Sequence, residues 1–155
     1  MRYLSLLMGL ILAGISYAES PAPLPIIACT FPSINGIAFG TYTVEGQNLT
    51  SVGSITYHCT GPVTAVAIKI TAGSAGEFNR AMLNNITGER LYYNLYLDPA
   101  RQIVWGEGSS GTGIYEEKPT PDISRSIPVY GYIPSGQDVG PGVYRDQLIV
   151  SLDFQ

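Results

Sequence analysis

Residues 144–154 read YRDQLIVSLDF, and the spacing of their apolar residues indicates the fold class. Successive side chains of a β-strand point to opposite faces, so a strand with one buried face shows apolar residues at every second position. Four apolar residues of this stretch follow that spacing and share one predicted face: Leu148, Val150, Leu152 and Phe154. We therefore expect a half-buried strand that continues to the penultimate residue.

The outer edge of this predicted strand has no obvious local cover. The alternation reaches Phe154 with no turn or polar tail after it, and only Arg145, Asp146 and Asp153 add charge to the stretch. Soluble proteins usually protect an exposed apolar edge strand, because such a strand pairs readily with other chains. Two interpretations stay open on the pattern alone. Another polypeptide supplies a neighbouring strand by β-augmentation, or an internal loop covers the edge.

The same two-residue period recurs upstream of residue 144. No window of 12 residues fits a helix, and 18 glycines and 11 prolines argue against long helices. About seven short strands separated by turn residues predict an all-β fold, an antiparallel β-sandwich. Besides the terminal stretch, the expected strands are Ser51–Thr60, Val63–Thr71, Arg90–Leu97, Gln102–Trp105 and Ile127–Ile133.

Composition narrows the range of functions. The 155 residues are enough for one domain, with 45% hydrophobic and 13% charged residues and a formal net charge of −4. A net negative chain is not expected to bind the phosphate backbone of nucleic acids. One histidine and two cysteines leave little for a metal site or a catalytic triad. We expect no cofactor and no enzymatic activity, and we interpret the acids of the predicted loops as solvated charges rather than a glycosidase pair: Glu107, Glu116, Glu117, Asp122 and Asp138.

Residues 1–18, MRYLSLLMGLILAGISYA, are typical of a secretory signal peptide, with cleavage expected between Ala18 and Glu19. The apolar run of about a dozen residues is shorter than the ~20 needed to cross a bilayer. We therefore expect an exported mature chain without a membrane span. In an oxidising compartment the only two cysteines, Cys29 and Cys59, are expected to form a disulfide.

Residues 19–28, ESPAPLPIIA, are interpreted as an N-terminal arm in front of a single domain at 29–155. Its three prolines fall on one parity, and four of its apolar residues fall on the other: Ala22, Leu24, Ile26 and Ala28. Proline has no backbone N–H, so an extended arm of this kind hydrogen-bonds fully along one edge only.

Two predicted strands carry tyrosines on their outer faces. Tyr92 and Tyr96 share one face of the first strand, and Tyr130 and Tyr132 share one face of the second. If the two strands are neighbours, the four side chains form a surface aromatic patch of the kind that contacts carbohydrates or proteins. The alternative is that these rings pack beneath the long predicted loops.

Several short blocks of the sequence, taken in their order along the chain, carry a resemblance to a known family. They are Cys29, Phe39–Tyr42, Ile55–Cys59, Leu91–Asp98 with Arg101, Val104–Gly108, Val129–Val139 and Gly142–Asp146. In this order the chain resembles the spore coat protein U family, which includes subunits of archaic chaperone–usher pili. The resemblance implies an incomplete immunoglobulin-like antiparallel β-sandwich that lacks its last strand. It also implies a structural subunit of a pilus or coat, exported through the periplasm to the cell surface.

Donor-strand complementation is the assembly route that the resemblance implies. A periplasmic chaperone lends a strand to the acceptor groove, and an outer-membrane usher exchanges it for the arm of a neighbouring subunit. The groove edges would be residues 144–154, with Leu148, Val150, Leu152 and Phe154, and residues near 37–44. The candidate donor strand would use Leu24, Ile26 and Ala28, although this arm is short and proline-rich for the role. A different interpretation is a self-contained secreted β-sandwich module that binds carbohydrate or protein.

Overall fold

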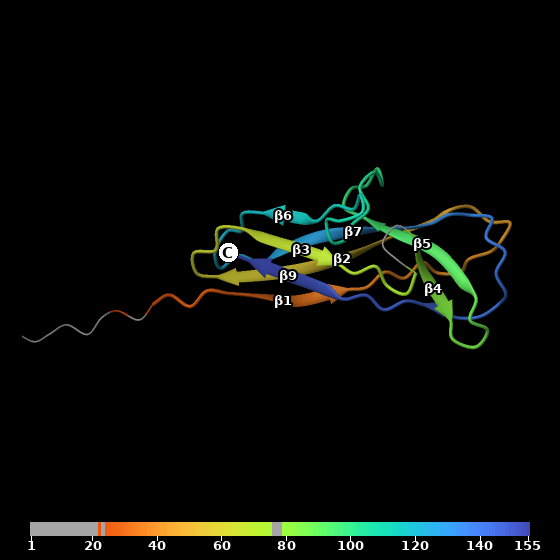
Figure 1. Cartoon of the computed structure of the whole chain (residues 1–155), viewed down its shortest axis with the longest axis horizontal. Coiled ribbons are helices and arrows are strands. Elements are labelled where there is room, and N and C mark those ends of the chain that lie inside the picture. Colours follow the sequence, from red (N-terminus) through yellow and green to blue (C-terminus); the bar gives the residue numbers. More distant parts are fainter. Residues whose placement is uncertain (1–21, 23, 76–78) are drawn as a thin grey trace, which may run out of the picture.

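The computed structural model describes residues 22, 24–75 and 79–155 (Figure 1). The predicted signal peptide and its cleavage site at Ala18 and Glu19 lie outside these residues. The described chain folds into strands: β1 (Ala28–Asn35), β2 (Leu49–Thr60), β3 (Val66–Ile70), β4 (Arg80–Asn84), β5 (Arg90–Tyr96), β6 (Tyr115–Glu117), β7 (Arg125–Ile133), β8 (Tyr144–Arg145) and β9 (Val150–Phe154). Across the same residues, no helix is both long and apolar enough to cross a membrane.

Two antiparallel sheets make up the domain. The larger sheet has the order β1-β2-β7-β5-β4-β8, and the smaller sheet has the order β6-β3-β9. Figure 1 shows an elongated molecule in which the arm before β1 and the C-terminal end of β9 lie toward the same end. The predicted all-β antiparallel sandwich is confirmed.

The core lies between the two sheets. Buried side chains alternate along the central strands of the larger sheet, as in Ile55, Tyr57 and Cys59 of β2, and they pack against β3 of the smaller sheet. Trp105 is fully buried between them, and its indole Nε1–H donates to the carbonyl oxygen of Ile68 over 2.9 Å. Each fully buried apolar side chain of this size contributes on the order of 1.5–3 kcal/mol.

Arg80 of β4 is also buried within this core. Its guanidinium donates to the carbonyl oxygens of Thr71 at 2.9 Å, Ile70 at 3.2 Å and Trp105 at 2.7 Å. It also donates to Oδ1 of Asn94 over 3.0 Å. These bonds connect β4 with β5, with the end of β3 and the residue after it, and with the segment that contains Trp105.

The predicted disulfide is present and joins β1 to β2. Cys29 and Cys59 are directly paired across the two strands, with a sequence separation of 30 residues. A loop of that length is stabilised by on the order of 3–4 kcal/mol when it is closed covalently. The pairing of β1 with β2 shifts between Thr30 and Ser33, where a β-bulge changes the side-chain parity.

Two predicted elements differ from the structure. The single strand expected at 144–154 is divided into β8, at the edge of the larger sheet, and β9, at the edge of the smaller sheet. The strand expected at Gln102–Trp105 forms only isolated bridges, Tyr96 with Val104 and Trp105 with Gly113. The cause of the division is that the chain crosses from one sheet to the other between Asp146 and Ile149.

Candidate functional site

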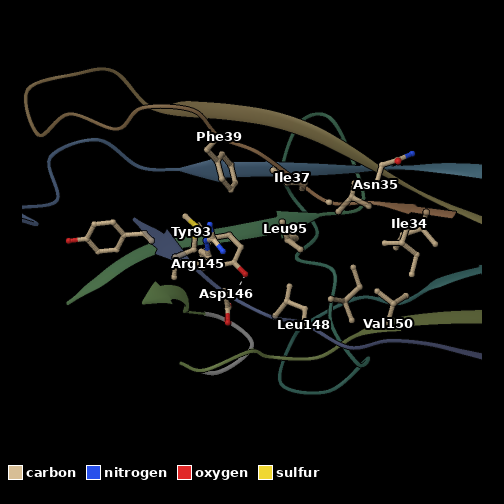
Figure 2. Close-up of a pocket in the computed structure, with 16 residues that line it drawn as sticks. Ile34, Asn35, Ile37, Phe39, Tyr93, Leu95, Arg145, Asp146, Leu148 and Val150 are labelled. Carbon is tan, nitrogen blue, oxygen red and sulfur yellow. Dashed lines mark hydrogen bonds between the residues drawn. The ribbon is translucent and has the colours of Figure 1, made fainter. Parts of the chain in front are cut away.

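An apolar cleft lies between the edges of the two sheets. β1 is an edge strand of the larger sheet and β9 is an edge strand of the smaller one, and among the described residues no strand pairs with the outer edge of either. The adjoining cavity has a volume of about 360 Å³. It is bordered by residues 34–39 on one side and 144–150 on the other (Figure 2).

The walls of this cleft are mainly apolar. Figure 2 shows Ile37 and Phe39 on the side opposite Leu148 and Val150, with Leu95 between them. Core side chains from both sheets complete the lining: Ile55, Ile70 and Val129. The side chain of Ile34, at the end of β1, is 49% exposed at one border. The arrangement therefore offers apolar surface to an extended apolar segment.

The hollow continues past Phe39. A second cavity of about 730 Å³ shares Ile37, Phe39, Met82 and Tyr144 with the first, and it runs between residues 37–44 and 139–144. The two cavities together follow the chain from Ile34 to Val44 along one border. An elongated shape of this kind suits a segment of extended chain better than a compact small molecule.

Glycines of the larger sheet make room for one wall of the cleft. A Cβ atom on Gly131 of β7 would lie 2.7 Å from Cζ of Phe39, and one on Gly53 of β2 would lie 2.6 Å from the carbonyl oxygen of Asn35. The segment after β1 therefore rests directly on the inner face of the larger sheet. There the ring of Phe39 meets the ring of Tyr93 edge-on, with centroids 6.0 Å apart.

One polar pair lies among the lining residues. The hydroxyl of Tyr93 donates to Oδ2 of Asp146 over 2.8 Å, and the backbone N–H of Gln147 donates to Oδ1 over 2.9 Å. Burial, followed by the hydrogen bond to the carboxylate of Asp146, raises the pKa of Tyr93 well above its ordinary value. Through this hydrogen bond the phenol of Tyr93 holds the β8–β9 connection against the cleft.

β1 and β9 approach each other closely at one point. Some of their Cα atoms are within 8 Å of each other. A strand inserted between two hydrogen-bonded neighbours needs about 9.6 Å between them, twice the ~4.8 Å spacing of paired strands. Insertion along this part of the cleft therefore requires the two edges to move apart.

The structure gathers only some of the predicted groove residues. Leu148 and Val150 line the cleft, whereas Leu152 and Phe154, further along β9, do not line it. Phe154 is 41% exposed. Sequence reasoning missed Ile34, because the β-bulge in β1 breaks the two-residue period that would have revealed it.

The candidate donor residues lie in two different settings. Leu24 is 88% exposed and Ile26 is 82% exposed, on the arm that extends away from the sandwich (Figure 1). Ala28 instead begins β1 and pairs with Thr60 of β2. The last residue of the predicted arm is therefore also the first residue of the ladder with β2.

The four predicted patch tyrosines lie on neighbouring strands, since β5 pairs with β7 through Tyr96 and Tyr130. Tyr92 is 37% exposed, and Tyr96, Tyr130 and Tyr132 are half-buried. The guanidinium of Arg101 lies over the ring of Tyr132, 5.2 Å from its centroid, and burial raises the pKa of Tyr96. Asn94, which lies between Tyr92 and Tyr96 in the sequence of β5, is buried and accepts a hydrogen bond from Arg80.

No group of three or more His, Cys, Asp or Glu side chains within 22, 24–75 and 79–155 is arranged to hold a metal ion. Glu116 and Glu117, which were expected in a loop, lie in β6. Glu117 accepts a hydrogen bond from the hydroxyl of Tyr57, and its carboxylate lies 3.4 Å from Nε of Arg125. These contacts connect β2, β6 and β7 at the end of the sandwich opposite the second cavity.

Comparison with known proteins identifies the family. The model of the Spore Coat Protein U domain matches residues 22–151. Protein U of Myxococcus xanthus is 34% identical to this chain in an alignment 144 residues long, and the aligned parts cover 82% of this chain and 78% of that protein. The chain belongs to the spore coat protein U family.

A solved structure shares the fold. It is a chain of the CsuC–CsuE chaperone–tip adhesion subunit pre-assembly complex from the archaic chaperone–usher Csu pili of Acinetobacter baumannii. The similarity has a TM-score of 0.54 at 18% sequence identity and covers 84% of this chain and 40% of that chain. The family membership predicted from the sequence blocks is confirmed, and so is the sandwich fold.

Proposed function

We propose that this protein is a structural subunit of a surface pilus or coat and that its cleft receives a β-strand from another polypeptide. The observation that carries the proposal is that β1 and β9 each have an open edge and that an apolar cleft lies between their sheets. An added strand would satisfy the backbone groups of both edges and cover the apolar lining in one step.

The family and the fold support this function. The chain belongs to the spore coat protein U family, and its sandwich is similar to a chain of a chaperone–tip adhesion subunit complex, which supports the proposal. We propose the corresponding partners: a periplasmic chaperone, an outer-membrane usher and neighbouring pilus or coat subunits. The proposed route leads through the periplasm to the cell surface.

The apolar lining of the cleft sets the free energy that an added strand can gain on binding. Each large apolar side chain that the added strand buries contributes on the order of 1.5–3 kcal/mol. Each residue that becomes ordered costs about 1–2 kcal/mol of backbone entropy, so a strand that is already extended within a partner protein binds better than a free peptide. A folded chaperone is a suitable donor for this reason.

Co-expression of residues 19–155 with a candidate periplasmic chaperone tests the proposal. We expect a complex of one subunit with one chaperone on size-exclusion chromatography. Leu148→Asp places a charge inside the cleft and should abolish the complex. Ile86→Asp is the matched control, because Ile86 is 88% exposed and does not line the cleft. Equal recovery of both variants with the chaperone would contradict the proposal.

A second candidate function is binding of carbohydrate or protein at the tyrosine patch. It is favoured by the pairing of β5 with β7, which brings Tyr96 next to Tyr130. The test is a glycan array with the wild-type chain and with Tyr96→Ala, where loss of a specific signal in the variant supports sugar binding. A wild-type chain without signal would count against a carbohydrate ligand.

A further inference from the structure

We infer that the strand entering the cleft comes from a different polypeptide and not from the proline-rich arm of a second copy of this chain. The inference rests on the proposed function and names the partner of the same cleft. In this scheme the protein receives a strand from a partner but does not donate its own arm to a cleft of this kind.

The cleft imposes a demand on both edges of its occupant. β1 borders it on the larger sheet and β9 borders it on the smaller sheet, so a strand that enters once these two edges have moved apart has a neighbour on each side. Consecutive residues of an extended strand direct their N–H and C=O groups to opposite neighbours. The occupant therefore needs N–H groups on residues of both parities.

The arm of this chain has N–H donors along one of its two edges only. Pro21, Pro23 and Pro25 occupy three consecutive positions of one parity and have no N–H to donate. Leu24 and Ile26, on the other parity, can donate and can direct their side chains to one face. One border strand would lose three donors in a row, which is why prolines are confined to strands with a single neighbour.

The arm is also anchored close to its last large apolar residues. Ala28 is held in the ladder with Thr60. The carbonyl oxygen of Ile26 lies against Gly61, where an added Cβ atom would approach it to 2.7 Å. Gly61 has a φ of +77°, a conformation that favours glycine, so this close approach is a feature of the turn after β2. The large apolar side chains of residues 19–27 are Leu24, Ile26 and Ile27, and Ile27 falls on the same parity as the prolines.

The chemistry of the expected partner follows from these limits. It is a protein strand with apolar residues at every second position and with no proline over about seven residues, so that both of its edges donate. A chaperone strand or the arm of a different subunit meets this description.

A pair of C-terminal fusions tests the inference on the whole mature chain. The chain ends just after β9, so a short flexible linker after Gln155 would let a fused strand return antiparallel along the open edge of β9 (Figure 1). The first fusion carries the native arm sequence SPAPLPII of residues 20–27. The second carries the same sequence with Pro21→Thr, Pro23→Thr and Pro25→Thr in the fused copy.

We expect the native fusion to leave the unfolding equilibrium constant within about threefold of the unfused chain. The threonine fusion should lower that constant on the order of a hundredfold, because each of three restored hydrogen bonds contributes a factor of about five. A third fusion that adds Leu24→Asp and Ile26→Asp to the threonine sequence should lose this gain. Urea unfolding followed by circular dichroism measures all three.

The outcomes separate the two claims. Equal stabilisation by the native and threonine fusions would overturn the inference and leave strand acceptance standing. No stabilisation by the threonine fusion would overturn strand acceptance, and the inference would fall with it. Stabilisation by the threonine fusion alone supports both.

Discussion

Gly131→Ala provides a sharp test of how the cleft wall is seated. The added Cβ would lie 2.7 Å from Cζ and 2.9 Å from Cε1 of Phe39, and 3.1 Å from Cδ1 of Ile37. Real Cβ atoms are not found this close to aromatic carbons, so Phe39 must move. Because Phe39 also packs on Tyr93, the whole wall after β1 should shift with it.

The expected cost can be worked out from two opposing effects. Overpacking of a filled core costs about 1–3 kcal/mol. Alanine in place of glycine restricts the unfolded chain and returns about 0.4–1 kcal/mol. We therefore expect Gly131→Ala to lower the free energy of unfolding by about 1–2 kcal/mol.

Urea unfolding is the assay, with Gly36→Ala as the matched control. A Cβ on Gly36 has no neighbour within 4 Å in the described structure, so that variant should be neutral or slightly stabilising. Gly131→Ala combined with Phe39→Leu should regain part of the loss, because the smaller side chain vacates the position of the clash. Equal stability of the two alanine variants, or no recovery in the double variant, would refute the packing argument.

Three further predictions concern the core, the disulfide and the tyrosines. Arg80→Met should lower the free energy of unfolding by about 3 kcal/mol or more, measured by urea unfolding, since buried carbonyl oxygens lose their donors. Replacing Cys29 and Cys59 together by alanine should cost about 2–4 kcal/mol, and a reducing agent should then have no further effect on the melting temperature. Burial raises the folded-state pKa of both Tyr93 and Tyr57 above 10.0, so their contribution to stability is complete below pH 10 and is lost as the pH rises further. Above pH 10 the free energy of unfolding should fall with pH by up to about 1.4 kcal/mol per pH unit for each tyrosine. This pH dependence should be weaker in Tyr93→Phe and in Tyr57→Phe, and an unchanged dependence would contradict the assignment.

The alternation of apolar residues predicted much of the sandwich. It located β2, β5 and β7, because in these strands one face is buried in the core and the other is not. It did not predict β4, where the buried side chains include Arg80 and Asn84 in place of apolar residues. A periodic apolar signal is absent when hydrogen bonds to backbone carbonyls make a polar side chain compatible with burial.

The cleft was predicted in part, for a different physical reason. The sequence indicates which residues of 144–154 share a face, and two of them, Leu148 and Val150, line the cleft. It does not indicate that the chain changes sheets before β9, so Leu152 and Phe154 were assigned to the same groove. The contribution of Gly53 and Gly131 depends on side chains from a distant segment, and no local pattern reports it.

Amide hydrogen exchange along β1 and β9 shows whether a strand enters the cleft. We expect the outward-facing amides of both strands to exchange rapidly in the free mature chain, because neither edge has a partner strand within the described structure. We expect slow exchange at both edges once the chain is bound to a strand-donating chaperone. Amides that are already protected in the free chain, or that stay unprotected in the complex, would show that the cleft does not receive a strand.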